Sequence, residues 1–416
     1  MEFIDLNALI KQPKKYPGGR PWIAIFDLKV TKNSPAGSCV LAEVLGLADE
    51  FDITVFSDAF DNDQTGRVHW VRVPLPSKPG FLRYMFFNLL APRALRRHSA
   101  QRGAPPALIQ ATQGQFIGAD ICYAHFCHRA YLKNQWQFQK AHGLRRLARW
   151  VANQYNAITE QLSFRSTRLV VSPSQGLLRE LTETYPFLKD QIYSIPNPVD
   201  TDFFARPKEF DRAPILMRLG LPVDARVLCF AALGDFSRKG LSVLMKALSG
   251  IDDESVWLLV VGGNAGEVAT FTAVARDLGV VNRVVFTGFQ SDVRPYLWVS
   301  DLFLLPSTYE IFPLVVIQAM AAGVPAIVTR LHGVAEYVVH GENAWFVERT
   351  PESVRAAIVD ALVDKDRLIS AGGAAYATAQ QYNQGKFVEA WRECIHHVLT
   401  VKSDDSRSSF ETELQP

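Results

Sequence analysis

The feature that most constrains the fold is a regular alternation between short apolar runs and helical patterns. The first half of the chain contains six such runs, PWIAIFDL, FDITVFSD, VHWVRVPL, ALIQAT, DICYAH and TRLVVSPS. The second half contains six more, RVLCFAALG, VWLLVVGG, RVVFTGF, DLFLLPS, VPAIVT and NAWFVE. Apolar, β-branched runs of this length that alternate with helices are typical of parallel sheets covered on both faces. The alternation therefore predicts an α/β chain with two doubly wound parallel sheets.

A hinge-like segment divides these runs between two domains. The 416 residues exceed what one core usually holds and fit two domains of roughly 200 residues. IPNPVDTDFF lies between the two series, so we expect Rossmann-like domains at 1–197 and 198–378, facing a central cleft that suits a ligand. We expect a helix at 379–402 to return to the first domain. SDDSRSSFETELQP is polar, which predicts a disordered tail at 403–416.

Composition limits the class of protein and its compartment. The sequence is 48% hydrophobic and 21% charged, which is typical of a globular protein. We find neither an apolar stretch long enough to cross a membrane nor a signal-peptide pattern. The five cysteines are scattered and no CxxC occurs, so neither a zinc site nor a disulfide framework is indicated. We expect a cytoplasmic protein.

Charge is unevenly distributed along the chain. Residues 1–200 carry 24 basic and 16 acidic side chains, whereas the remainder carries 20 and 26. Such an imbalance suggests that the first domain faces an anionic partner. Apolar residues interleave with arginines in PGFLRYMFFNLLAPRALRR, which favours the inner face of an anionic membrane over nucleic acid. A helix with its Phe and Leu in the core and its arginines in solvent is an equally open interpretation.

The run from Leu304 to Val328 has the pattern of a ligand site. It contains a buried strand, a loop with one carboxylate (Glu310), a helix, and a second buried strand. This order places the carboxylate and a helix N-terminus at the carboxyl edge of a parallel sheet. Open α/β sheets bind ligands at that edge, and a helix N-terminus favours a phosphate.

Several motifs in the second half make the chain resemble the retaining glycosyltransferases of family 4, the group 1 family with the GT-B fold. IPNPVDTDFF, SRKG, VVGGN, RVVFTGF and DLFLLPSTYE occur in the family's order and spacing, and the resemblance covers about residues 22 to 400. It implies transfer of a hexosyl group from a nucleotide-diphosphate sugar, with retention, to a glycan or lipid-linked acceptor. The resemblance implies a role in surface polysaccharide or glycoconjugate synthesis, without a metal or other cofactor.

The resemblance gives roles to residues around the donor phosphates. Arg238 and Lys239 match the family's basic pair, and positive charge there stabilises a diphosphate leaving group as its bond breaks. The turn Ile311-Phe312-Pro313-Leu314 matches the one whose backbone amides meet donor sugar and phosphate. Pro313 has no N–H to donate but suits the first turn of the following helix.

Two positions correspond to the family's E-x7-E motif. Glu310 matches the first carboxylate, which contacts donor sugar hydroxyls and steadies positive charge at the anomeric carbon; a solvated loop glutamate is the alternative. Gln318 occupies the second position, where the family's carboxylate accepts hydrogen bonds from the ribose. Glutamine keeps one acceptor oxygen but loses the charge, so we expect weaker donor binding.

Other donor-site positions also depart from the family. The arginine that usually precedes the RKG lysine is missing from the stretch Leu233-Gly234-Asp235. The family's paired glycines near the phosphate are reduced to Gly37, which is either a phosphate contact or an ordinary turn residue. Gly263, in the VVGGN turn, and Phe289, where base contacts would be largely through the backbone, complete the expected donor site.

His125, at the end of the run DICYAH, resembles the family's histidine near the donor sugar. A core-edge histidine is the alternative interpretation. We expect it to hydrogen-bond the donor sugar or the reacting centre rather than to act as a general base. In front-face attack the leaving phosphate accepts the acceptor's proton, so no protein nucleophile is required.

Four alternative interpretations fit parts of the sequence. A non-catalytic GT-B partner subunit that binds nucleotide or glycan weakly would explain the missing arginine, the single glycine and Gln318. A sugar-nucleotide epimerase fits the RKG pattern and Glu310 less well. Asp61-Asn62-Asp63 spells a DxD metal motif but lies in a polar segment that reads better as a solvated turn. No GxGxxG follows a strand, so a nicotinamide dehydrogenase is poorly supported.

Overall fold

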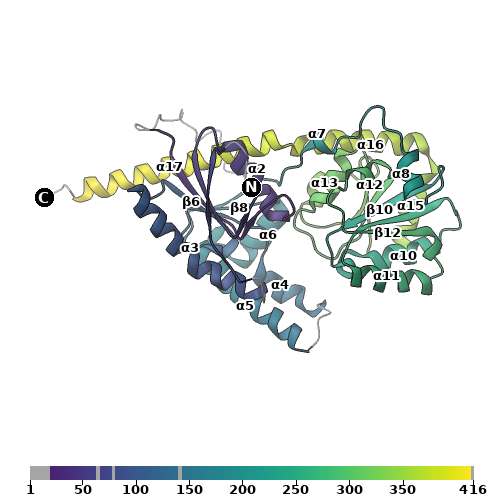
Figure 1. Cartoon of the computed structure of the whole chain (residues 1–416), viewed down its shortest axis with the longest axis horizontal. Helices are drawn as coiled ribbons and strands as arrows, with labels where there is room; N and C mark the ends of the chain where they lie inside the picture. The colour runs from purple at the N-terminus through teal and green to yellow at the C-terminus, as the bar shows by residue number, and fades with distance from the viewer. Residues whose placement is uncertain (1–18, 62–65, 77–79, 139–142, 414–416) are drawn as a thin grey trace. The chain divides into compact units, whose positions relative to one another are not determined.

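The chain folds as two compact units (Figure 1). The computed structural model describes residues 19–61, 66–76, 80–138 and 143–413. Unit 1 comprises the chain up to Pro196 together with the segment from Gly385 onward, and unit 2 comprises Asn197–Gln384.

Unit 1 is built on a seven-stranded parallel sheet with the order β5-β3-β1-β6-β7-β8-β9. Its strands are β1 (Trp22–Phe26), β3 (Asp52–Ser57), β5 (Val68–Arg72), β6 (Leu108–Thr112), β7 (Ile121–Tyr123), β8 (Leu169–Ser172) and β9 (Ile192–Ser194), and the two-residue strands β2 (Lys29–Val30) and β4 (Ala59–Phe60) pair separately. The strand order reverses between β1 and β6. That switch point is where sheets of this kind bind ligands.

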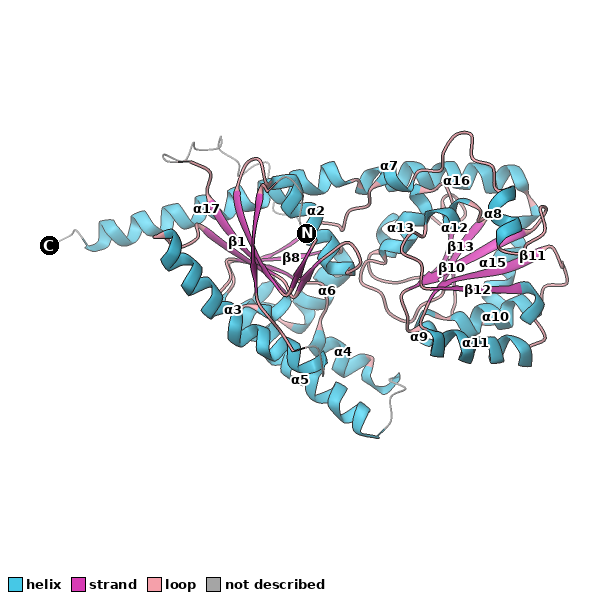
Figure 2. Ribbon diagram, viewed as in Figure 1, coloured by secondary structure: helices cyan, strands magenta, loops and turns pink. Residues whose placement is uncertain are grey.

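Helices cover both faces of the unit 1 sheet (Figure 2). They are α2 (Pro35–Leu47), α3 (Gly80–Arg102), α4 (His128–Asn134), α5 (Gly143–Ser166), α6 (Gln175–Thr184) and α17 (Gln384–Glu413), with short 3-10 turns η1 (Gln113–Gln115), η2 (Trp136–Phe138) and η3 (Pro186–Leu188). Helices α2 and α17 pack together, since a Cβ on Gly46 would lie 2.3 Å from Val388. Within the part of the chain that the structure describes, no helix has the length and apolar character needed to cross a membrane.

Unit 2 is built on a six-stranded parallel sheet with the order β12-β11-β10-β13-β14-β15. Its strands are β10 (Arg226–Ala232), β11 (Val256–Gly262), β12 (Val284–Gly288), β13 (Leu302–Leu305), β14 (Ala326–Thr329) and β15 (Ala344–Val347). The four residues of β13 are all buried, as are those of β14. The twelve apolar runs of the sequence are strands of the two sheets, and the prediction of two doubly wound parallel sheets is confirmed.

The helices of unit 2 alternate with its strands. They are α7 (Thr201–Phe204), α8 (Ala213–Arg218), α9 (Phe236–Lys239), α10 (Leu241–Ser249), α11 (Ala265–Asp277), α12 (Arg294–Trp298), α13 (Leu314–Ala321), α14 (Val334–Tyr337), α15 (Pro351–Val363) and α16 (Lys365–Ala379), with 3-10 turns η4 (Val281–Arg283) and η5 (Gln380–Tyr382). Figure 2 shows α10 and α11 on one side of the sheet and α13 and α16 on the other. The strand order reverses between β10 and β13, which makes their carboxyl ends the expected ligand edge.

Two expected boundaries need correction. Unit 2 continues to Gln384 rather than 378, because the Val199 amide donates to the Tyr382 carbonyl at 2.8 Å and ties the two ends of the unit together. The last helix begins at Gln384, and it continues to Glu413 where a disordered tail was expected from residue 403. Once a helix has formed, each further residue adds a hydrogen bond at little cost, so a polar segment can extend it.

Candidate functional site

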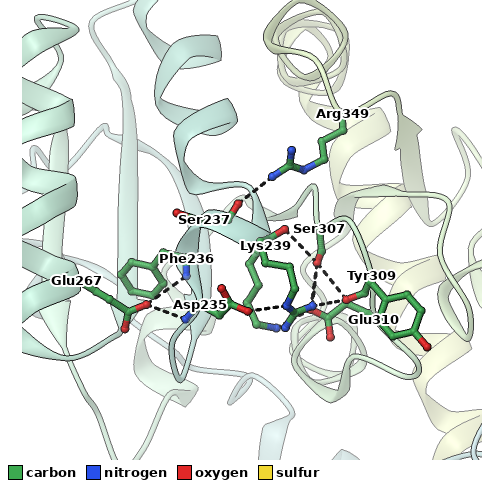
Figure 3. Close-up of polar contacts among 10 residues, drawn as sticks. Asp235, Phe236, Ser237, Lys239, Glu267, Ser307, Tyr309, Glu310 and Arg349 are labelled. Carbon is green, nitrogen blue, oxygen red and sulfur yellow. Dashed lines mark hydrogen bonds and ion pairs between the residues drawn. The ribbon is translucent and has the colours of Figure 1, made fainter. Parts of the chain in front are cut away.

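The carboxyl ends of β10 and β13 bring three of the expected site residues into direct contact. Arg238 and Lys239 lie in α9, the helix that follows β10, and Glu310 lies in the loop after β13. Figure 3 shows the side chains of Lys239 and Glu310 next to each other. Because these strands are neighbours at the switch point, the residues meet although about seventy positions separate them in sequence.

The Glu310 carboxylate is held through one of its two oxygens. Its Oε1 accepts hydrogen bonds from Lys239 Nζ at 2.7 Å, Arg238 Nη1 at 3.1 Å and Ser307 Oγ at 3.2 Å. The carboxylate is 14% exposed and the Lys239 side chain 15% exposed. The alternative of a freely solvated loop glutamate is therefore wrong. Oε2, with no partner recorded among the described residues, is the oxygen that a ligand hydroxyl could reach.

Arg238 is fixed by two further contacts. Its Nε donates to Asp235 Oδ2 at 2.7 Å, and its Nη1 donates to the carbonyl of Tyr309. Burial lowers the pKa of Arg238, but the neighbouring carboxylates of Glu310 and Asp235 outweigh it and raise the pKa above its usual value. The guanidinium therefore stays charged and ready to face an anion.

A carboxylate on α11 shapes the loop that precedes Arg238. Asp235 has a left-handed backbone with a φ of 59°, which non-glycine residues seldom adopt. Glu267 Oε1 accepts from the Asp235 amide at 2.7 Å and from the Phe236 amide at 3.3 Å. Glu267 also completes a capping box with Asn264 at the start of α11. The loop is thus fixed by side chains outside the motif.

Gly263 is required by packing beneath this loop. The Phe236 ring is fully buried between Phe230 and Phe271, with ring centroids 5.4 and 5.6 Å away. Gly263 has a φ of 77°, and a Cβ on it would lie 2.4 Å from the Phe236 ring. Gly263 therefore supports α9 from below. A direct contact between Gly263 and the nucleotide-sugar stays a prediction.

Arg349 joins the two loops that carry the cluster. It follows β15, and its Nη2 donates to the Ser237 carbonyl at 2.8 Å while its Nε donates to the Pro306 carbonyl at 3.0 Å. Burial lowers the pKa of Arg349. No pattern in the sequence identifies this arginine, because its role depends on reaching two backbone carbonyls from another strand.

The turn after Glu310 is largely a core element. Ile311 is 9% exposed and Phe312 is 7% exposed, and the Phe312 ring packs against Tyr337 and Tyr382. Pro313 is the N-cap of α13 rather than a residue of its first turn, so Leu314 is the first helical residue. The buried side chains of Ile311 and Phe312 leave the backbone as the part of these residues available to a ligand, and the expected amide contacts stay a prediction.

Two further donor-site candidates lie near this edge of the sheet. Gln318 is half-buried in α13, one turn beyond Leu314. Phe289 follows β12 directly, and its side chain is 57% exposed. Neither Gln318 nor Phe289 is among the described hydrogen-bond or ion-pair partners of Glu310, so their roles toward a nucleotide stay predictions.

Gly37 and His125 belong to unit 1, whereas Arg238, Lys239 and Glu310 belong to unit 2. Gly37 lies in the first turn of α2, and a Cβ there would lie 1.8 Å from the Lys29 carbonyl oxygen. Close packing of α2 on the backbone after β1 therefore explains this glycine; a phosphate contact stays a prediction. Asn62 and Asp63 of the DxD sequence lie outside the described residues, as does the N-terminal segment 1–18, in which no signal-peptide pattern was found.

The His125 imidazole lies just beyond the carboxyl end of β7. Its ring packs on Tyr123 with centroids 4.1 Å apart, and Nε2 is buried without a hydrogen-bond partner among the described residues. Burial lowers the pKa of His125 to about 3, so the ring is neutral at physiological pH. A neutral imidazole can donate or accept a hydrogen bond but cannot supply positive charge.

Comparison with known sequences identifies the family. The family model "Glycosyl transferases group 1" matches residues 224–364, and "Glycosyltransferase Family 4" matches residues 36–203. The chain belongs to the group 1 glycosyltransferases of the family 4 type. Both units match a model of this family, and the segment after β10 and β13 that holds Arg238, Lys239 and Glu310 lies within the first match.

Individual relatives agree with this family. A lipopolysaccharide core biosynthesis glycosyltransferase, LpsE of Rhizobium meliloti, is 32% identical over 186 residues, which are 44% of this chain and 51% of LpsE. Across the first curated relatives the matched region spans 51% to 64% of their length.

Solved structures share the fold. WaaG, a glycosyltransferase of lipopolysaccharide biosynthesis, superposes with a TM-score of 0.74 at 19% identity, covering 90% of this chain and 99% of WaaG. HepE of Anabaena, solved with UDP-glucose, gives 0.66 at 18% identity, covering 90% of this chain and 99% of HepE. The two parallel-sheet units thus form a GT-B fold.

Proposed function

We propose that the protein is a retaining glycosyltransferase that moves a hexosyl group from a nucleotide-diphosphate sugar to a glycan or lipid-linked acceptor. The observation that carries the proposal is the contact among Arg238, Lys239 and Glu310 at the switch point of unit 2. Paired cations at this edge suit a diphosphate, and the open oxygen of Glu310 suits a sugar hydroxyl. The relatives in lipopolysaccharide synthesis favour a surface polysaccharide or glycoconjugate as the product.

We propose that the transfer is a front-face reaction. The bond between the anomeric carbon and the leaving phosphate oxygen breaks while the acceptor oxygen bonds to the same face of that carbon. The acceptor's proton passes to the leaving phosphate oxygen, so no protein base or nucleophile is needed. Arg238 and Lys239 stabilise the charge that grows on the diphosphate, and Glu310 orients the sugar.

We propose that the reaction needs no metal or other cofactor. The two cations already supply positive charge where a diphosphate would develop its negative charge. Turnover that persists in excess chelator would support this part of the proposal, and complete loss restored by a divalent cation would contradict it.

A panel of nucleotide-sugars tests the function, with UDP-glucose first because HepE was solved with it. We expect release of nucleoside diphosphate from at least one donor in the presence of membrane lipid extract, with retention at the anomeric carbon. Glu310→Gln should lower turnover at least tenfold, while Glu336→Gln on α14 serves as the matched control. No turnover with any donor would contradict the proposal.

The second candidate is a non-catalytic GT-B subunit that binds nucleotide or glycan weakly. Gln318 favours it, because a neutral amide replaces the carboxylate expected to bind a ribose. Gln318→Glu separates the two candidates. Tighter donor binding together with faster turnover supports an enzyme, whereas a folded protein that stays inactive with every donor supports the second candidate.

We propose that unit 1 contacts an anionic membrane through α3 and α5. On α3, Phe87 and Ala91 are fully buried, but Phe86 and Leu89 on the same helix are exposed. Part of the apolar face of α3 therefore packs in the core, and the exposed part is the one that we assign to the membrane. On α5, Leu144 is 85% exposed and Leu147 is 56% exposed.

The charges on these two helices suit an anionic lipid surface. Helix α3 contains no Asp or Glu, and the single acidic residue of α5, Glu160, is fully buried. Arg93, Arg96, Arg97, Arg146 and Arg149 are exposed. Apolar side chains flanked only by positive charge match a bilayer with anionic headgroups.

Vesicle binding tests this contact. We expect the full chain to sediment with vesicles of phosphatidylglycerol but not with phosphatidylcholine alone, and Leu144→Gln with Leu147→Gln should abolish binding. Val359→Gln with Val363→Gln, two exposed positions of α15 in unit 2, is the matched control. Equal binding by both double variants, or no binding to anionic vesicles, would contradict the contact.

A further inference from the structure

One buried glutamine in unit 1 fixes the loop that carries His125. Gln113 directly follows β6, is 6% exposed, and has a φ of 54°. A left-handed backbone is strained for a non-glycine residue and persists only where its surroundings hold it. Its neighbour Gly114 shows how tightly the segment is packed, because a Cβ there would lie 2.6 Å from the backbone of Thr159 in α5.

The Gln113 amide reaches into the histidine loop, residues 124–128, with both of its polar atoms. Its Oε1 accepts from the backbone N–H of His125 at 2.5 Å and of Phe126 at 3.2 Å. Its Nε2 donates to the Phe126 carbonyl at 2.8 Å and to Glu160 Oε2 at 3.0 Å. Two consecutive amides of the loop are therefore bound by a side chain rather than by a neighbouring strand.

Glu160, on α5, completes the support from the other side. It is fully buried; its Oε2 also accepts from the His128 amide at 3.0 Å and its Oε1 accepts from the Tyr185 hydroxyl at 2.8 Å. Burial raises the pKa of Glu160 to about 7, although these hydrogen bonds oppose the rise. The Gln113 side-chain amide, the His128 backbone amide and the Tyr185 hydroxyl all donate to Glu160. The network therefore suits a carboxylate that accepts hydrogen bonds at both oxygens.

The position of the His125 imidazole depends on this support. Its Nε2 is buried and makes no hydrogen bond with the described residues, so no polar contact of that atom orients the ring. The ring's position is set by its packing on Tyr123 and by its own backbone, which Gln113 holds. Glu160 accepts from Gln113 Nε2 and so keeps Gln113 Oε1 turned toward the amides of His125 and Phe126.

We propose that Gln113 and Glu160 are positioning residues that hold the His125 imidazole in place for the transfer reaction. The inference rests on the proposed function for the role of His125. The placement of the imidazole itself can be measured without turnover, so the two can fail separately.

Titration of the imidazole tests the placement. In full-length protein labelled with 15N-histidine, His125→Asn identifies the His125 ring signals, which are followed from roughly pH 4 to 8. We expect no titration of His125 in the wild type. In Gln113→Glu and Glu160→Gln, which keep size but break the donor–acceptor match, its midpoint should rise by at least about two units toward the ordinary histidine value. A His125 that stays silent in both variants would overturn the proposal.

The chain contains a matched control. Glu43 and Gln110 form a second buried Glu–Gln pair in unit 1, with Gln110 Nε2 donating to Glu43 Oε2 at 2.9 Å. Within the described part of the chain, no hydrogen bond joins this pair to the histidine loop. Glu43→Gln therefore changes an equally buried carboxylate, and it should leave the His125 signals unchanged. Titration of His125 in this variant as well would show general loosening of unit 1 and would also overturn the proposal.

Kinetics then connect the placement to the reaction. With UDP-glucose, or the donor that the panel identifies, Gln113→Glu and Glu160→Gln should lower kcat about tenfold or more and leave KM within about threefold. The double variant, which exchanges the two side chains, should recover part of the loss. If the titration shows a displaced imidazole but kcat is unchanged, the claim that the placement of His125 matters for the reaction would be overturned. Absence of turnover with every donor would count against the proposed function, and the titration would still decide the placement.

Discussion

At the residue scale, the cluster around Glu310 is electrically balanced before any ligand binds. Arg238 and Lys239 face the carboxylates of Glu310 and Asp235. A diphosphate that binds here has to compete with those carboxylates for the same two cations. Glu310 also has a proposed contact with the donor sugar, whereas Asp235 has none. We therefore expect that removing the charge of Asp235 strengthens donor binding without loss of the sugar contact.

We expect Asp235→Asn to bind UDP about three- to tenfold more tightly than the wild type. The change weakens a partly exposed ion pair with Arg238, worth roughly 1 kcal/mol, and asparagine tolerates the left-handed backbone of this position. Isothermal titration with UDP measures the affinity. Asp292→Asn, which breaks the pair with Arg294 elsewhere in unit 2, is the control. Weaker binding by Asp235→Asn would show that Asp235 orients Arg238 for the phosphate instead.

Glu43 should make the stability of unit 1 depend on pH. Its carboxylate is fully buried in α2, and burial raises its pKa from 4.5 to about 8. The folded state thus prefers the protonated acid. Its stabilising contribution is complete below the unfolded pKa and is lost as pH rises through the folded one.

Glu43→Gln should remove this dependence, because an amide does not ionise. Relative to the wild type, we expect its free energy of unfolding to increase by about 3 kcal/mol between pH 5 and 8.5. Urea denaturation across that pH range measures the difference. A difference between the two proteins that stays constant with pH would rule out ionisation of Glu43 in this range.

At the scale of elements, the junction between α9 and α10 depends on one glycine. Gly240 ends α9 with a φ of 91°, and a Cβ on it would lie 2.3 Å from the Pro306 carbonyl oxygen. The Thr308 amide donates to the Arg238 carbonyl at 3.1 Å across the same junction. The backbone at the end of α9 thus lies close to the backbone that follows β13, and this close approach allows Lys239 to reach Glu310.

Gly240→Ala should therefore destabilise unit 2 more than the loss of a left-handed glycine alone would. Gly279→Ala is the matched control, since Gly279 has a φ of 71° but open space where its Cβ would stand. We expect the Gly240 variant to lose about 2 kcal/mol more than the control, from the added clash. Thermal unfolding of both variants measures the difference. Equal losses would mean that the α9 backbone can move away from Pro306.

Most strands of the two sheets were predictable because buried parallel strands are apolar along their whole length, as in LFLL of β13 and AIVT of β14. Strand β9, at the edge of the unit 1 sheet, was missed, because its three residues, IYS, are only half-buried and form no apolar run. The meeting of Glu310 with Arg238 and Lys239 followed from the family resemblance and from the topology of such sheets. Asp235, Glu267 and Arg349 could not be predicted, because their roles arise from backbone geometry and from carbonyl groups on other strands. The missed end of unit 2 has the same cause, since the pairing of Val199 with Tyr382 leaves no pattern in the sequence.

At the scale of the whole molecule, the chain begins in unit 1, passes through unit 2 and ends in unit 1. The returning helix α17 is bound to unit 1 by ion pairs. Arg392 contacts Glu50 at 2.7 Å and Lys402 contacts Asp120 at 2.8 Å. Helix α17 should therefore contribute to the stability of the N-terminal sheet, although it follows unit 2 in sequence.

Substitution of one buried tryptophan in each unit tests this division. Trp391 of α17 is fully buried and packs edge-to-face on Tyr123, with ring centroids 4.9 Å apart, whereas Trp345 of β15 is 2% exposed in unit 2. Either change to alanine should cost about 3–5 kcal/mol through the cavity that it leaves. We expect Trp391→Ala to accelerate hydrogen exchange in β1, β6 and β7, and Trp345→Ala to accelerate it in β13 and β14. Faster exchange spread equally over both units in Trp391→Ala would mean that α17 does not belong to the folding unit of the N-terminal sheet.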